Sequence, residues 1–207
     1  MNLALVTSYI IAGMLTLSLI MMNLRVSNNS TELTLTQITR QHMTDVTEML
    51  NDDLSNMGYD VDKKSSQILT HASENEIRFY RNIQNDPSRL PELITWKFFP
   101  GDSVATAKNP NLRVLKRIID DPNSGATEET EIRTGVTRFE MRYYDQRGEN
   151  LANNMAPPGS GSAVSDIKQI YVVLEMQSKE PVILNPNSDD RYVRSVYEKR
   201  FTPANLE

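Results

Sequence analysis

The sequence predicts an α+β protein: a long N-terminal helix whose first half is embedded in a membrane and whose second half packs on an antiparallel β-sheet. Three observations predict this class. They are an uncharged apolar run at the N-terminus, a helical stripe that follows it, and short runs of alternating polarity over the remaining chain. We divide the 207 residues into a transmembrane segment at 1–24, an amphipathic helix at 25–58 and a globular antiparallel-sheet domain at 59–207.

The first 24 residues carry no charge, and the first charged residue is Arg25. As a helix, Leu3 to Leu24 extends roughly 33 Å, which is enough to cross a hydrocarbon core of about 30 Å. A basic N-region and a small-residue cleavage site are not evident, so we predict an uncleaved or barely trimmed membrane anchor rather than a secretory signal or a buried soluble helix. Orientation is weakly encoded, because the flanking Arg25 and Arg40 slightly favour the cytoplasmic side for the segment that follows the anchor.

The next segment, residues 31–57, has the spacing of an amphipathic helix. Its apolar residues recur at steps of mostly three to five: Leu35, Ile38, Met43, Val46, Leu50, Leu54 and Met57. We expect Asp45, Glu48, Asp52 and Asp53 to lie on the solvated side and Gly58 to stop the helix. The polar stretch 27–30 is a poor helix interior, which leaves open a kink there.

The remaining chain contains runs with period-two alternation, which predict strands with one buried and one wet face. They are 76–81, 93–99, 112–119, 135–145, 166–177 and 192–201. Turn-forming residues separate them, and the polar segment 145–165 is the longest connection. Because the helix is the only long amphipathic element, we expect it to cover the apolar face of one sheet.

Composition argues against several classes of function. A basic stripe is lacking, and the segment 1–62 holds seven acidic and two basic residues, so nucleic-acid binding is not predicted. The chain has no Cys and only two His, His42 and His71, neither with a second ligand at metal-like spacing. We therefore predict no catalytic, cofactor-binding or metal residues, no cofactor and no enzyme activity.

Two residue sets have weaker functional interpretations. The acidic pairs are interpreted as parts of a solvated helix face and of turns: Asp52–Asp53, Asp120–Asp121 and Asp189–Asp190. A hard-cation site in the 120–125 loop is an alternative that we do not favour. The aromatic residues could line a ligand pocket but more often form core and cross-strand pairs: Trp96, Phe98, Tyr143 and Tyr144.

Three strings resemble the type IV pilin-like superfamily. The first is Leu54-Ser55-Asn56-Met57-Gly58-Tyr59, like the end of the pilin helix. The second is 73–83 followed by 94–98, like the paired strands. The third is 111–117 followed by 135–148, like the "LxR…GVTxFxxxYYDxxG" stretch. With the strand at 167–181, the resemblance covers nearly the whole chain. Within that superfamily, the chain is similar to a minor pseudopilin of the type II secretion system or a J- or W-type minor pilin.

The resemblance implies a pilin-like fold and a structural role in filament assembly and protein transport. It implies as partners the lipid bilayer and other pilin-like or pseudopilin subunits. It also implies a single-pass protein of a bacterial inner membrane with a periplasmic domain. Ala4, Ser8, Ala12 and Thr16 form a small-residue face suited to helix contacts, or are small residues scattered by chance. The alternative function is a membrane-tethered extracytoplasmic ligand-binding or sensor module.

The chain departs from the family within the apolar run. Members have a Glu as fifth mature residue, whereas this run contains no acidic residue and Leu5 stands fifth from Met1. Cleavage at Gly13 would leave about 11 apolar residues, too few to span a bilayer. We expect the run to remain intact, and we hypothesise that a subunit at a filament tip could dispense with that Glu.

Overall fold

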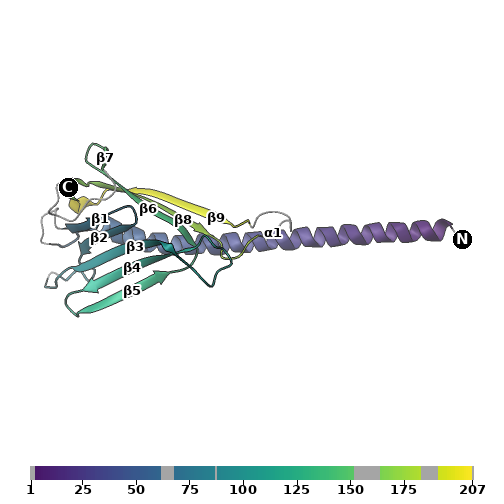
Figure 1. Ribbon diagram of the computed structural model, residues 1–207, viewed down its shortest axis with the longest axis horizontal. Helices are drawn as coiled ribbons and strands as arrows, with labels where there is room; N and C mark the ends of the chain where they lie inside the picture. The colour runs from purple at the N-terminus through teal and green to yellow at the C-terminus, as the bar shows by residue number, and fades with distance from the viewer. Residues whose placement is uncertain (1–2, 62–67, 87, 152–163, 183–190, 207) are drawn as a thin grey trace.

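The computed structural model describes residues 3–61, 68–86, 88–151, 164–182 and 191–206, and it confirms the α+β class. A single long helix, α1 (Leu3–Ser55), precedes the strands. The strands are β1 (Leu69–Ala72), β2 (Glu76–Arg81), β3 (Glu92–Ser103), β4 (Arg113–Asp121), β5 (Ala126–Ile132), β6 (Val136–Tyr144), β7 (Asn150–Leu151), β8 (Gln169–Gln177) and β9 (Arg194–Phe201). There are also two short 3-10 helices in the described chain: η1 (Val164–Asp166) precedes β8, and η2 (Ala204–Leu206) follows β9. The strands gather around the C-terminal half of α1, and the N-terminal half projects alone (Figure 1).

The strands form two antiparallel sheets, so the expectation of one sheet is wrong. The first sheet has the order β1-β2-β3-β4-β5 and the second has the order β7-β6-β8-β9. Alternation of polar and apolar residues tells which side of a strand is buried, but it does not tell which strand lies beside it. A row of residues in register, Ile77, Trp96 and Arg117, crosses the middle of the first sheet from β2 to β4.

Each of the six predicted alternating runs contains or overlaps one strand, and 76–81 matches β2 at both ends. Three strands were not predicted. β1 and β7 are too short for a periodic signal, and β5 reads ATEETEI, with few apolar residues to alternate. β7 lies inside the predicted 145–165 connection, of which residues 152–163 are outside the described chain.

Helix α1 continues without interruption through the polar stretch 27–30, so the structure has no break there. Thr31 and Thr34 donate hydroxyl hydrogen bonds to the carbonyls of Ser27 and Ser30, one turn back along the helix. The helix ends at Ser55, three residues before the predicted stop. Gly58 follows with a φ of +72°, and its N–H bonds to the carbonyl of Tyr80 on β2. The glycine therefore turns the chain toward the first sheet.

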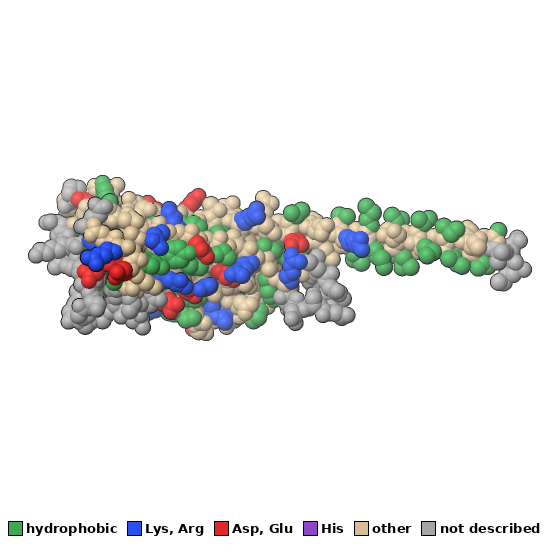
Figure 2. All heavy atoms as spheres, turned by 90° about the horizontal axis from the view of Figure 1, so that it is seen from above, with side chains coloured by type: hydrophobic (Ala, Val, Ile, Leu, Met, Phe, Trp, Pro, Cys, Tyr) green, Lys and Arg blue, Asp and Glu red, His purple; other side chains and the backbone are tan. Residues whose placement is uncertain are grey.

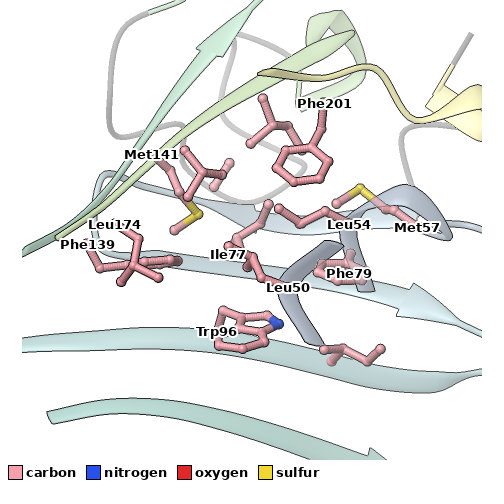
Figure 3. Close-up of a cluster of buried hydrophobic side chains, with 14 of the residues drawn as sticks. Leu50, Leu54, Met57, Ile77, Phe79, Trp96, Phe139, Met141, Leu174 and Phe201 are labelled. Carbon is pink, nitrogen blue, oxygen red and sulfur yellow. The ribbon is translucent and has the colours of Figure 1, made fainter. Parts of the chain in front are cut away.

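The core lies between the two sheets, with the C-terminal half of α1 inside it. Figure 3 shows Leu50 and Leu54 of the helix between Trp96 of the first sheet and Phe201 of the second. Both leucines and Trp96 have no exposed surface. The rings of Trp96 and Phe139 stack with their centroids 6.3 Å apart, which joins the sheets directly. Burial confirms the predicted stripe from Met43 to Met57, whereas Ile38 is 47% exposed.

Candidate membrane anchor and helix-to-sheet junction

The N-terminal half of α1 is an apolar stalk, defined here as residues 4–24, against which no strand of the described chain packs. Apart from the half-buried Val6, its large apolar side chains are 51–73% exposed, and they point in all directions around the helix. Figure 2 shows this stalk as a rod covered by hydrophobic side chains. By length and composition the helix could span a membrane. So much contiguous apolar surface on a small protein marks a site of contact with lipid or protein.

Two threonine hydroxyls of the stalk are compatible with an apolar surrounding. Thr7 and Thr16 donate their hydroxyl protons to the carbonyls of Ala4 and Ala12, at 3.0 and 2.9 Å. Such bonds satisfy the hydroxyls within the helix, so that they need no water. The predicted small-residue face, with Ala4, Ser8, Ala12 and Thr16, is exposed along one side. Its role in helix contacts stays a prediction.

The C-terminal half of α1 is bonded to the first sheet through a buried carboxylate. Asp53 has no exposed surface, and its Oδ2 accepts from Trp96 Nε1 at 2.8 Å. Arg117 donates from Nε at 2.6 Å and from Nη2 at 2.7 Å, one bond to each oxygen. Arg81 adds a longer bond to Oδ1 at 3.2 Å. The neighbouring Asp52 is exposed and accepts from the same Arg81 at 2.8 Å.

This arrangement places two guanidinium groups and an indole N–H around one helix position. The hydrogen bond to Asp53 raises the pKa of Arg117 above its ordinary value, despite partial burial. A two-pronged Arg–carboxylate bond requires a fixed distance and angle, so it positions α1 relative to β3 and β4. The expectation that both Asp52 and Asp53 lie on a solvated face is therefore wrong for Asp53.

The burial of Asp53 could have been inferred from its position in the sequence. The residue lies three positions after Leu50 and four before Met57, so it belongs to the same helix face as the apolar stripe. An acidic residue in such a stripe is buried only with a partner. The partner, Arg117, comes from a strand whose neighbour in space is not encoded locally, and this is why the pairing was missed.

A second junction joins α1 to the second sheet. The side-chain oxygen of Asn51 accepts from Tyr197 Oη at 2.9 Å and from Lys199 Nζ at 2.7 Å, both on β9. Nearer the stalk, Arg191 donates to Glu32 at 2.7 Å. The helix is thus held by side-chain bonds on both sides, to the first sheet through Asp53 and to the second through Asn51.

Residues considered for chemistry serve structural roles where the structure describes them. Within the described residues, no group of three or more His, Asp or Glu side chains could hold a metal ion, and this includes His42 and His71. In the 120–125 loop, hydrogen bonds from the backbone and side chain of Asn123 and from Ser124 lower the pKa of Asp121 to about 2. Asp120 accepts from Thr127. Asp189 and Asp190 lie outside the described residues.

The aromatic residues that could have lined a pocket are mostly core. Trp96 and Tyr143 have no exposed surface and Phe98 has 7%. Burial raises the pKa of the Tyr143 hydroxyl, which donates to the carbonyl of Ser73 at 2.8 Å. Tyr144 lies under the guanidinium of Arg200. The described surface is instead hollowed beside the β4–β5 turn, in a recess of about 320 Å³ lined by residues that include Tyr80, Leu93 and Pro122.

Comparison with known proteins gives no identification: no protein-family model matches the chain, and no curated protein matches it. The resemblance to type IV pilin-like proteins therefore stays a prediction. The structure adds an exposed apolar stalk that continues, as one helix, into the core of a two-sheet domain.

Proposed function

We propose that this chain is a non-enzymatic structural subunit of a pilin-like filament, a minor pseudopilin of a type II secretion system or a minor pilin. One observation carries the proposal. A single uninterrupted helix has a first half with exposed apolar side chains on every side and a second half buried between two sheets. We place the stalk in a bacterial inner membrane and the sheet domain in the periplasm.

The exposed stalk suits two successive surroundings. In a bilayer, lipid chains would cover its apolar side chains, and in a filament the stalks of other subunits would cover the same side chains. Neither surrounding requires a change in the helix, because the backbone bonds are satisfied internally in both. Helix packing then supplies the shared centre of the filament, and the sheet domain supplies the choice of neighbours.

The junction supports a role in assembly rather than in signalling. Asp53 and Asn51 bond the C-terminal half of the helix to both sheets, and the same uninterrupted helix continues into the stalk. A subunit extracted from a membrane into a filament needs such a link, because a pull on the stalk must carry the domain with it. We propose no catalytic role, since Asp53, Asp120 and Asp121 are bonded within turns and ion pairs.

Partner identification tests the proposal. The full chain, with an affinity tag at its C-terminus, is extracted gently from the membranes of its native cells, and co-purifying proteins are identified by mass spectrometry. We expect other proteins that each have a long N-terminal apolar helix and a small sheet domain. A Leu15→Arg variant, which changes the stalk alone, should lose them. Recovery of a kinase or transporter instead would favour the tethered sensor.

The side of the membrane can be tested separately, because the chain has no Cys. A Val196→Cys variant places a single thiol on a side chain of β9 that is 45% exposed. A maleimide that does not cross membranes should label it in intact spheroplasts as strongly as in lysed cells. Labelling only after lysis would place the domain in the cytoplasm and would contradict the proposed periplasmic location.

A further inference from the structure

Each of the two sheets has open edges. In the described chain, β5 ends the first sheet and β9 ends the second, with no strand beyond either. These edge strands have seven and eight residues, whereas the opposite edges, β1 and β7, have four and two. An edge strand presents a row of unpaired backbone N–H and C=O groups that can pair with another strand.

The two long edges carry opposite charge. β5 reads ATEETEI and holds three Glu with no basic residue. β9 reads RSVYEKRF and holds three basic residues with one Glu. Nearly all of these charged side chains are exposed. A protein that only needed to protect its edges from pairing could use one sign of charge on both. Opposite signs make each edge a complementary surface for the other.

Part of this charge forms no ion pair with the described residues of the subunit. Lys116 pairs with Glu129 and Glu131, but Glu128 forms no ion pair in the described chain. On β9, Lys199 donates to the uncharged Asn51. Arg200 donates to the uncharged Gln169 and lies over the Tyr144 ring, with its guanidinium carbon 4.6 Å from the ring centroid. Lys199 and Arg200 thus remain available to an acidic strand.

The directions of the strands also match. β9 runs toward the C-terminal end of α1, where Asn205 beyond it donates to the carbonyl of Met57. β2 runs the same way, since Tyr80 near its end accepts from Gly58. Three antiparallel steps, from β2 through β3 and β4, give β5 the opposite direction. Figure 1 shows both edges lying along the axis of α1.

We propose that β5 of one copy pairs antiparallel with β9 of a second copy of this chain, joining the two domains side by side. The inference rests on the proposed function for one point, that both stalks enter the same bilayer in the same direction. In that arrangement a β5 edge and a β9 edge of neighbouring copies run antiparallel, as all strand pairs of the described chain do. Pairing of β5 with β5, or β9 with β9, would oppose like charges.

Such a contact is weak in solution and effective in a membrane. A single strand pair buries much less than the roughly 1,200 Å² of a standard interface, so detergent-solubilised copies should be monomeric. Anchoring in one bilayer removes most of the orientational freedom and raises the effective concentration, which strengthens the same contact. The contact is heterologous, since it leaves a free β5 and a free β9 at the two ends for further copies.

The test uses two full-length chains, Thr127→Cys on β5 and Val196→Cys on β9, with tags of different size. Both are inserted into vesicles and treated with a flexible bis-maleimide. We expect the mixed β5–β9 crosslink to exceed each like-edge crosslink by about fivefold or more, because like-charged edges repel. The like-edge products form in the same sample and serve as the matched control. Flotation with the vesicles confirms that each chain is anchored.

Charge reversal sharpens the test. Glu128→Lys with Glu129→Lys on the Thr127→Cys chain should lower the mixed crosslink to the level of the like-edge products. Adding Lys199→Glu with Arg200→Glu to the Val196→Cys chain should restore it. Restoration also shows that the reversed chains are folded. Equal mixed and like-edge crosslinks, or reversal without effect, would overturn the pairing alone. Chains that fail to float would overturn the anchor and the pairing together.

Discussion

The two halves of α1 share a helical backbone and an apolar character, yet they have opposite surroundings. In the stalk, the large apolar side chains other than Val6 are 51–73% exposed, whereas from Met43 to Met57 the buried ones are 0–7% exposed. Most helices in proteins owe their stability to packing of one face. The second half obtains this packing from two sheets. The stalk needs an equivalent cover, at about 25 cal/mol for each Å² of apolar surface removed from water.

Charge follows the same division. The buried half contains Asp53, which is tolerated because Arg117, Arg81 and Trp96 all donate to it. The stalk contains no charged residue. Lipid offers no donor to a carboxylate, so an unpartnered charge there is costly. The halves therefore differ in what each can accommodate: the second accepts a charge with matched partners, and the first accepts none.

The largest expected effect comes from removing the buried carboxylate. Asp53→Ala should lower the free energy of unfolding of the detergent-solubilised chain by ~3–5 kcal/mol, because the partly buried Arg117 loses its carboxylate partner and Arg81 keeps only the exposed Asp52. Trp96 is the single tryptophan and contacts Asp53 directly, so its fluorescence reports the denaturant transition. Asp52→Ala is the control, since that side chain is 60% exposed and should change little. Equal losses from the two variants would contradict the assigned role of Asp53.

A truncation of the same kind in each half compares packing directly. Leu54→Ala leaves a cavity between the sheets and should cost ~2–5 kcal/mol of unfolding free energy. Leu15→Ala removes the same atoms from a side chain that is 61% exposed, so the domain should unfold at the same denaturant concentration as the unaltered chain. A matching shift for Leu15→Ala would mean that the stalk packs on the domain in solution.

A charge in the stalk should weaken membrane insertion and leave the stability of the sheet domain unchanged. Leu15→Arg should weaken insertion into vesicles by ~2.5–3.5 kcal/mol, the cost of an arginine near the centre of a spanning helix. Unfolding of the sheet domain should be unchanged. Flotation on a density gradient measures the first quantity and Trp96 fluorescence the second. Retained flotation would show that the stalk is not the membrane-contacting segment.

Much of the fold could be predicted from the sequence because its signals are local. The uncharged run, the stripe from Met43 to Met57 and the alternation along β6 each follow from residues within one element. The exposed polar strand β5 was not predicted, since a strand that pairs with β4 through its backbone needs no apolar alternation. The division into two sheets was not predicted, because contacts between residues distant in sequence determine which strands are neighbours.

The junction was less predictable than the anchor for a related reason. An anchor is defined by what the run 1–24 lacks, which one segment shows by itself. Asp53, Trp96 and Arg117 come from α1, β3 and β4, and their meeting depends on the register Trp96 opposite Arg117. Asp53 has the spacing of the apolar stripe, although we expected it on the solvated side, and spacing within one helix cannot show that separate strands bring donors to it.

The smallest expected effect concerns the second junction. Asn51→Ala removes the acceptor shared by Tyr197 and Lys199 and should cost ~0.5–1.5 kcal/mol of unfolding free energy, as for hydrogen bonds near a surface. Asn29→Ala, at an exposed position of the same helix, is the control and should leave the domain unchanged. Because Asn51 and Asp53 hold different sheets, Asn51→Ala should increase amide exchange in β9 more than in β3, and Asp53→Ala the reverse. Equal exchange in both strands for each variant would show that the two sheets open as one unit. The protein would then have two independent parts, the stalk and the whole sheet domain.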